Sequence, residues 1–305
     1  MKVLIGVDGS QRSLQAVEFV SEILSAEKDE IALYFSPPRL EVAGAKQHTE
    51  VAELAQQAFV DAVFAKAKSK LPESMATKAT THTSNGKPAE GLLKLADELQ
   101  VGLIVVGAQG GSRRLQFFTG GTARAVAHAA VHPVLVVRGD ELPREPPFRV
   151  LVASGCDNVW RRAAEPLNRF TWPSGTESKL LHVVEAIDED HYGALLAEAH
   201  PSVPHAEELV NEFRTLTAVQ RSNCLEQLTA NRESMPAIIK DAEVDVAQGH
   251  VVEQIIHQVH QDKIDLLVVG VHRHSAIRRL LGSTSEGLLL QSPCSLLICH
   301  ADDAH

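Results

Sequence analysis

Aromatic residues are scarce in this chain: Phe, Tyr and Trp make up 4% of its 305 residues. Hydrophobic residues nevertheless make up 44%, which excludes an intrinsically disordered chain and leaves Val, Leu, Ile and Ala to fill the cores. Those residues are typical of buried parallel strands and helices rather than of a β-sandwich. No apolar run approaches the roughly 18 residues that a membrane-spanning helix needs, and the opening MKVLIGVDGS does not have the form of a signal peptide.

Cysteine is also rare. The four cysteines, Cys156, Cys224, Cys294 and Cys299, include no CxxC pair, so we expect reduced, packed thiols in a cytoplasmic protein. Cys294 and Cys299 would face opposite sides of one strand, an arrangement that suits neither a disulfide nor a metal site.

The formal net charge of −10 argues against a nucleic-acid partner. The charge is unevenly distributed, because residues 1–140 hold 15 basic and 15 acidic side chains. The whole acidic excess therefore lies in the second half. An anionic ligand would meet less repulsion in the first half.

A polar, proline-rich stretch divides the chain. Residues 140–147 (DELPREPP) have no apolar periodicity, and proline neither continues a helix nor donates to a strand ladder. We therefore predict domains at 1–139 and 148–305, joined by a linker at 140–147.

The same order of elements is expected on both sides of this linker. In the first half we predict strands at 2–7, 30–36, 75–84, 101–107 and 133–138. Helices are expected after residue 10 and at 48–70, 86–99 and 122–130. In the second half the expected strands are 148–153, 179–184, 237–247, 264–270 and 294–299. The expected helices there are 158–170, 206–229, one that begins near 249, and 283–290.

Alternating strands and helices predict parallel sheets with right-handed crossovers. The fold class is therefore α/β, with two tandem Rossmann-like domains. Each domain is expected to be an open five-stranded parallel sheet with helices on both faces.

Ligands of such sheets bind beyond the carboxyl ends of the strands, where the strand order reverses. Two polar features of the first domain follow predicted strands: Asp8-Gly9-Ser10, and a loop that runs from Gly107 through Gly110 to Gly120, Gly121 and Thr122. Glycines and a helix start favour phosphate binding, because they present backbone N–H groups to an anion. A carboxylate suits a ribose hydroxyl or an adenine amine. Each feature alone is more often a cap or a turn; their combination favours a site.

The pattern Gly107-x2-Gly110-x9-Gly120, with Asp8 at the end of the first strand, resembles that of the universal stress protein family, and in particular its tandem-domain members. The likeness covers nearly the whole chain twice. It implies an adenine nucleotide alpha hydrolase-like fold and a site for ATP or a related adenine nucleotide, with or without Mg. The resemblance assigns nucleotide contacts to Asp8, Phe35, Val106, Gly107, Gly110, Gly120, Gly121 and Thr122.

The sequence departs from the family pattern at two places. Gly121 stands where the pattern has Ser or Thr, although Thr122 follows at once. The second domain departs further: Gly155 aligns with Asp8, Arg273 replaces the second glycine, and the loop is one residue short. We therefore expect the second domain to be a degenerate copy and the chain to bind at most one nucleotide.

The expected function is a cytosolic stress-response protein that acts by binding and association rather than by turnover. No P-loop, GxGxxG or catalytic triad pattern identifies an enzyme, and no catalytic or metal-binding residue is assigned. His272 and His274 form a His-x-His pair without a nearby third ligand. A nucleotide-free scaffold of the same fold and a slow ATPase remain alternatives.

Self-association is the other partner interaction expected. Two predicted strands are apolar edge strands, Pro133–Arg138 and Cys294–Cys299. Such strands would promote aggregation if their edges were left exposed. We expect them to pair antiparallel within the chain, as the family resemblance also implies, and a homodimer of such units is a further possibility. No membrane partner is expected.

Overall fold

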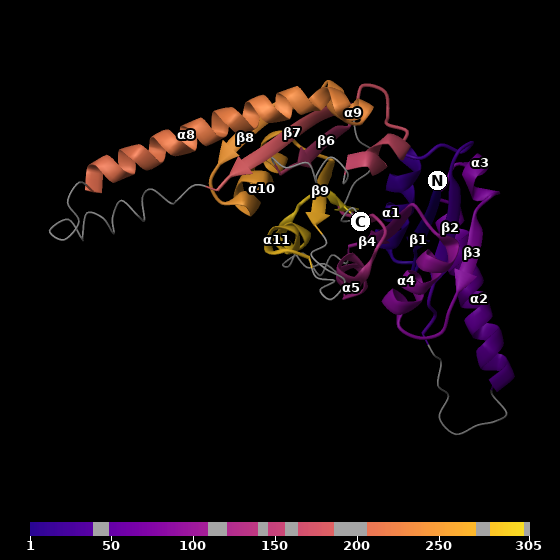
Figure 1. Ribbon diagram of the computed structural model, residues 1–305. Helices are drawn as coiled ribbons and strands as arrows, with labels where there is room; N and C mark the ends of the chain where they lie inside the picture. Colours follow the sequence, from indigo (N-terminus) through magenta and orange to yellow (C-terminus); the bar gives the residue numbers. More distant parts are fainter. Residues whose placement is uncertain are drawn as a thin grey trace.

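The computed structural model describes residues 1–38, 49–108, 121–139, 146–155, 164–185, 206–272 and 281–301. Within these ranges the strands form one ten-stranded sheet in the order β3-β2-β1-β4-β5-β10-β9-β6-β7-β8. Figure 1 shows the first half of the chain at one end of this sheet and the second half at the other.

The first domain contributes five parallel strands. They are β1 (Lys2–Gly6), β2 (Glu30–Phe35), β3 (Thr80–Thr83), β4 (Leu103–Gly107) and β5 (Val134–Val137). Its helices are α1 (Gln11–Glu22), α2 (Thr49–Lys68), α3 (Glu73–Ala76), α4 (Pro88–Leu99) and α5 (Gly121–Ala129). The strand order reverses between β1 and β4, the position at which open sheets of this kind bind ligands.

The second domain repeats this order of strands. It consists of β6 (Arg149–Ala153), β7 (Glu177–Val184), β8 (Glu243–Gln248), β9 (Leu266–His272) and β10 (Ser295–Ala301), all parallel. Its helices are α8 (Ala206–Asn231), α9 (Ala237–Lys240), α10 (Val251–Gln261) and α11 (Ser283–Gln291), with short 3-10 turns η2 (Glu165–Arg169) and η3 (Arg232–Ser234). The predicted fold class, two tandem Rossmann-like α/β units, is confirmed.

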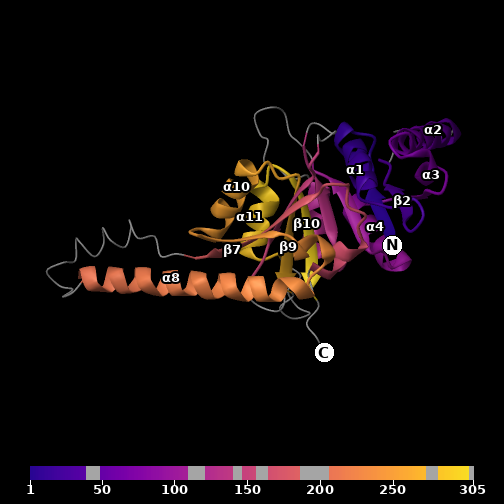
Figure 2. The same ribbon diagram turned by 90° about the horizontal axis from the view of Figure 1, so that it is seen from above.

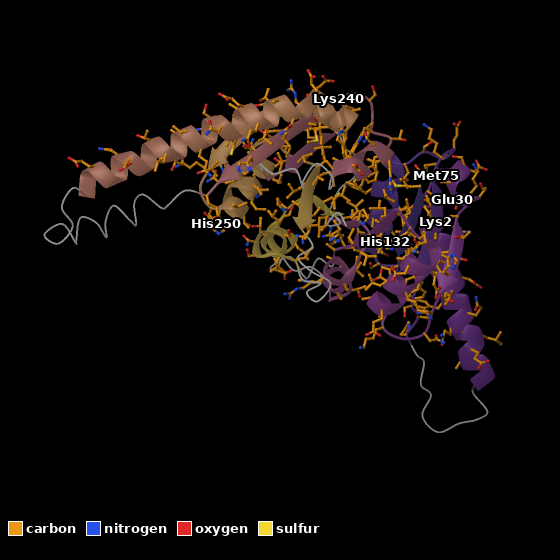
Figure 3. The ribbon with its side chains drawn as sticks, viewed as in Figure 1. Lys2, Glu30, Met75, His132, Lys240 and His250 are labelled. Atoms are coloured by element: carbon orange, nitrogen blue, oxygen red, sulfur yellow. The ribbon has the colours of Figure 1, made fainter. Side chains whose placement is uncertain are left out.

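Helices cover both faces of the sheet, because neighbouring strand residues point to opposite sides. Val3 and Ile5 of β1 belong to a buried cluster that also takes in side chains of α1, α2 and α8. Leu4, between them, belongs to a second cluster with α4, α5, α10 and α11. Figure 3 shows the side chains that fill these layers; Lys2 and Glu30, labelled there, are register partners at the start of β1 and β2.

β5 and β10 join the two five-stranded units, and they pair antiparallel with Leu135 opposite Leu297. Arg138, which follows β5, reinforces the joint. Its guanidinium donates to the carbonyl oxygens of Leu289 and, at 2.6 Å, of Ser292, at the carboxyl end of α11. The pairing covers the outer edges of β5 and β10. Neither apolar strand is therefore left exposed at the edge of a sheet.

The helices α5 and α11 also meet across the joint. Glu286 of α11 lies 2.6 Å from Nη2 of Arg124 and 2.5 Å from Nε2 of His128, both on α5. On the opposite face of the sheet, the rings of Phe19 and Phe148 have centroids 6.1 Å apart. The contact between the domains therefore extends over both layers of helices.

Two of the predicted strands are wrong at their beginnings. Met75 was expected in a strand at 75–84, yet it lies in α3, and β3 starts only at Thr80. Ala237 was expected in a strand at 237–247, yet it opens α9, and β8 starts at Glu243. Each helix follows a proline at its cap, which fits the first turn of a helix because the missing N–H has no intrahelical partner there.

The helix expected at 158–170 differs as well. Residues 165–169 form a 3-10 turn, and residues 156–163 lie outside the described part of the chain. The long helix expected at 206–229 is present as α8, which extends well beyond the sheet in two views (Figures 1 and 2). No helix in the described ranges is both long and apolar enough to cross a membrane.

Candidate functional site

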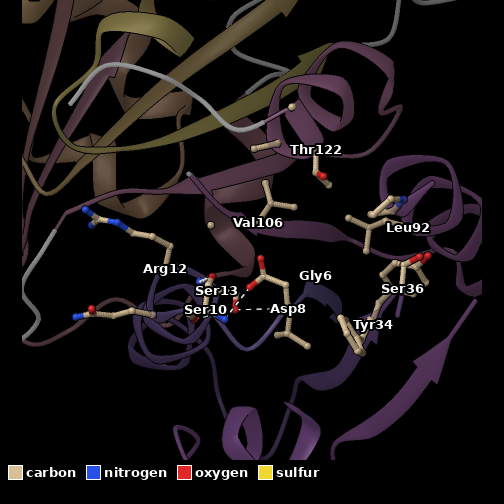
Figure 4. A pocket seen from close by; sticks show the side chains of 17 residues that line it. Gly6, Asp8, Ser10, Arg12, Ser13, Tyr34, Ser36, Leu92, Val106 and Thr122 are labelled. Carbon is tan, nitrogen blue, oxygen red and sulfur yellow. Dashed lines mark hydrogen bonds between the residues drawn. The ribbon is translucent and has the colours of Figure 1, made fainter. Parts of the chain in front are cut away.

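A pocket of about 680 Å³ opens at the carboxyl ends of β1, β2 and β4, beside the starts of α1 and α5 (Figure 4). It lies at the point where the strand order reverses. Its volume falls within the roughly 300–1,000 Å³ usual for small-molecule sites. The lining residues are Gly6, Val7, Asp8, Ser10, Gln11, Arg12, Ser13, Tyr34, Phe35, Ser36, Pro88, Leu92, Val106, Gly107, Gly121, Thr122 and Ala123.

Asp8 follows β1 and presents its carboxylate to the pocket. The backbone N–H of Ser10 donates to Oδ1 of Asp8 at 2.9 Å. Partial burial by itself would raise the pKa of the Asp8 carboxyl, but hydrogen bonds from Ser10 and Ser13 outweigh it and hold that pKa below its ordinary value. Asp8 is therefore an anion at neutral pH, and its oxygens accept hydrogen bonds.

The turn after Asp8 is fixed by local hydrogen bonds. Gly9 has a φ of +77°, a conformation that glycine adopts without steric cost. Ser10 caps α1: its Oγ accepts from the backbone N–H of Ser13 at 3.3 Å. The Ser13 hydroxyl in turn accepts from the N–H of Asp8 at 3.2 Å and donates to the Ser10 carbonyl at 3.0 Å. This network holds Asp8 in place before any ligand arrives.

Gly107, at the end of β4, brings two backbones into direct contact. A Cβ at this position would lie 2.7 Å from the carbonyl oxygen of Arg12 and 3.1 Å from the backbone nitrogen of Ser13. Only glycine lets β4 and the first turn of α1 meet in this way. Gly107 therefore sets the floor of the pocket.

Gly121 and Thr122 open α5 on the opposite side of the pocket, and both are exposed. The first N–H groups of a helix have no intrahelical partners and attract anions. A Cβ on Gly121 would meet no described atom within 4 Å, so crowding by the described residues does not require glycine here.

The far side of the pocket is formed by β2 and α4. Tyr34 is buried and its hydroxyl bonds with that of Ser84 at 2.6 Å. Phe35 is 4% exposed, and its ring packs edge-on against Phe59 and Phe64 of α2. This side therefore combines apolar surface with a few fixed polar groups.

The structure brings six of the predicted site residues to this one pocket: Asp8, Phe35, Val106, Gly107, Gly121 and Thr122. Gly110 and Gly120 lie at 109–120, outside the described residues. Arg12, Tyr34, Ser36 and Leu92 also line the pocket, and sequence reasoning missed them. In the sequence, only the position of Arg12 one turn after Asp8 indicated that it lies near the site. Tyr34, Ser36 and Leu92 could be assigned to the pocket only once the packing of β2 against α4 was known.

The corresponding end of the second domain is only partly described. Arg273 and His274, in its shortened loop, lie outside the described residues, as do residues 156–163 after β6. Gly282 caps α11, as expected for the counterpart of α5. The predicted degeneracy of this domain stays a prediction.

Both halves of the chain match one known protein family. The universal stress protein family matches residues 1–138 and again residues 149–300. The chain belongs to the universal stress protein family.

Two solved structures share the fold over nearly the whole chain, and a third matches about half of it. One from Archaeoglobus fulgidus DSM 4304 is 18% identical, covers 98% of each chain and has a TM-score of 0.63. A putative universal stress protein from Pseudomonas aeruginosa UCBPP-PA14 is 12% identical, covers 99% of this chain and 94% of that one, and has a TM-score of 0.57. A universal stress protein in complex with cAMP is 27% identical over 45% of this chain and 97% of its own, with a TM-score of 0.36.

Proposed function

We propose that the first domain of this universal stress protein binds ATP or a related adenine nucleotide, and that the protein acts through binding and association rather than turnover. The observation that carries the proposal is one pocket lined by an ionised carboxylate, apolar surface and the start of a helix. The carboxylate suits a ribose, the apolar surface suits a purine, and the start of the helix suits a phosphate.

The charge distribution sets the orientation of the ligand. Asp8 would repel a phosphate, whereas it can accept hydrogen bonds from a ribose hydroxyl or an adenine amine. The base would lie toward Tyr34, Phe35 and Leu92, where the surface is apolar. The phosphates would then meet the loop after Gly107 and the N–H groups at the start of α5.

Magnesium would enter bound to the phosphates. Among the described residues that line the pocket, Asp8 supplies the carboxylate, and no group of three metal-ligating side chains occurs within the described ranges. A magnesium ion that is held mainly by phosphate oxygens and water needs no more than this.

The nucleotide-free scaffold is the second candidate, and Gly121 is the observation that favours it. A hydroxyl is missing where the family pattern has one, which removes one donor to the phosphates. A slow ATPase is a less specific alternative, because no described residue of the pocket except Asp8 has the carboxylate or imidazole of a general base. Cytoplasmic location, a role in stress and a homodimer are parts of the same proposal.

Two measurements test the proposal. Acid release of nucleotide from protein purified without added ligand should yield an adenine nucleotide. Calorimetric titration should then show binding that Asp8→Ala weakens and that Gly110→Val blocks, because the family resemblance assigns a nucleotide contact to Gly110. Lys94→Gln, on the exposed surface of α4, is the control and should bind as the wild type does. Unchanged affinity in both site variants would exclude this pocket as the site.

A further inference from the structure

The joint between the domains is built around a pseudo-two-fold axis. The strand order β3-β2-β1-β4-β5 on one side is repeated as β8-β7-β6-β9-β10 on the other. At the axis β5 and β10 run antiparallel, with Leu135 opposite Leu297. In a symmetric surface of this kind, equivalent patches of the two units face each other. The apolar strands alone would therefore also let two first domains, or two second domains, pair in the same way.

The helices beside the axis distinguish the two domains. α5 and α11 have nine residues each; Arg124 is the fourth residue of α5, and Glu286 is the fourth residue of α11. These equivalent positions meet, because Nη2 of Arg124 lies 2.6 Å from Oε1 of Glu286. Figure 1 shows α5 and α11 next to each other at the joint. The two domains thus place opposite charges at the same position of the repeat.

This ion pair is partly withdrawn from solvent. The side chain of Glu286 is 21% exposed, and that of Arg124 is 53% exposed. The second carboxylate oxygen of Glu286 lies 2.5 Å from Nε2 of His128, one turn further along α5. The residue of α11 that corresponds to His128 is Leu290, which carries no charge. Charges that are partly shielded from water interact more strongly, whether they attract or repel.

Pairing of like domains would turn the attraction into repulsion. Two first domains would bring Arg124 against a second Arg124 and a second His128, with no carboxylate at the fourth position of either helix. Two second domains would bring Glu286 against a second Glu286. A partly buried charge that faces a like charge instead of its partner is costly.

We propose that Arg124 and Glu286 determine which domains pair at this joint, so that the surface of β5 and α5 accepts a second domain and rejects another first domain. Specificity requires repulsion of the wrong partner as well as attraction to the right one. The apolar pairing of β5 with β10 supplies attraction without discrimination, and the charged side chains supply the discrimination. Two chains that associate then use another surface or exchange unlike domains.

Two substitutions in the full-length chain reproduce the contacts of like domains. Glu286→Arg places two cations at the joint, as two first domains would. Arg124→Glu places two anions there, as two second domains would. Each should lower the urea midpoint of unfolding. Glu286→Gln, which removes the attraction without adding repulsion, should lower it less than Glu286→Arg does, and high salt should reduce this difference because it screens the repulsion.

The double variant Arg124→Glu/Glu286→Arg restores opposite charges in exchanged positions. It should recover at least half of the summed loss of the two single variants, although His128 no longer faces a carboxylate on α11. Glu98→Arg is the control, since it makes the same reversal beside Lys94 on the exposed surface of α4. It should shift the midpoint little.

The remaining outcomes decide for or against the proposal. Losses that add up in the double variant, or a double variant that does not fold, would overturn it, because the side chains would then only fill space at the joint. Equal midpoints for Glu286→Arg and Glu286→Gln would overturn it as well, since like charges would carry no penalty. If a single reversal prevents folding and the double variant folds, the proposal is supported.

Discussion

The carbonyl oxygen of Arg12 lies 2.7 Å from the point that a Cβ on Gly107 would occupy. This contact joins the first turn of α1 to the end of β4. It places the turn after Asp8 and the start of the glycine-rich loop on the same small area of backbone. The geometry of the pocket therefore depends on one missing methyl group.

Gly107→Ala should destabilise the protein for that reason. The added methyl would force β4 and α1 apart, at a cost of about 1–3 kcal/mol in the free energy of unfolding. Urea denaturation measures this cost. Gly121→Ala is the matched control, because a Cβ there meets no described atom within 4 Å. Equal effects of the two substitutions would mean that the close contact is not significant.

Gly121→Ser should tighten nucleotide binding severalfold. The substitution restores the hydroxyl of the family pattern, and the space around Gly121 accepts a Cβ without contact to any described atom. Gly121→Ala separates the two effects, since it adds the Cβ without the hydroxyl. If calorimetry gives the two variants the same affinity for ATP, the missing hydroxyl does not limit binding.

The pocket and the joint between the domains show which parts of the structure could be predicted from the sequence. The strands at β1, β4 and β9 were predictable because each is a continuous apolar run that ends at a glycine or a polar turn. Asp8, Gly107 and Thr122 were predictable because they follow such strands or open a helix. Short helices were not: α3 and α9 have four residues each, too few for a helical period to be visible beside a strand.

Contacts between segments that are distant in the chain could not be predicted from the sequence either. The hydrogen bond from Arg12 to the carbonyl oxygen of Gly139 depends on where β4 and β5 end relative to α1. Glu286 is one of many acidic residues in the second half, and nothing in the local pattern assigns it to Arg124 and His128 of the first half. Such pairs are fixed by the packing of whole domains.

Arg138→Met should destabilise the joint between the domains. The guanidinium donates to the carbonyl oxygens of Leu289 and Ser292, and its removal takes away both hydrogen bonds in a mostly buried region. The expected loss is about 1–3 kcal/mol in the free energy of unfolding. Arg149→Met is the control: its ion pair with Glu177 is partly exposed and should contribute no more than about 1 kcal/mol. Calorimetric unfolding that gives both variants the same loss would contradict this account of the joint.

The thiols of Cys294 and Cys299 should be inert in the folded protein. Burial raises the pKa of Cys294 to about 11 and that of Cys299 to about 12, so almost no thiolate forms at pH 8. Alkylation at pH 8 followed by peptide mass spectrometry should label them only after unfolding in urea. Rapid labelling of either thiol in the native protein would show that the joint at β10 opens.

The number of nucleotides bound per chain tests the central claim most directly. Calorimetric titration of the nucleotide-free full-length protein with ATP should give one site per chain, because the second domain has Gly155 where Asp8 stands and Arg273 where Gly110 stands. Asp8→Ala should weaken that single site. A protein that binds no nucleotide, or one that binds two per chain with equal affinity, would contradict the account.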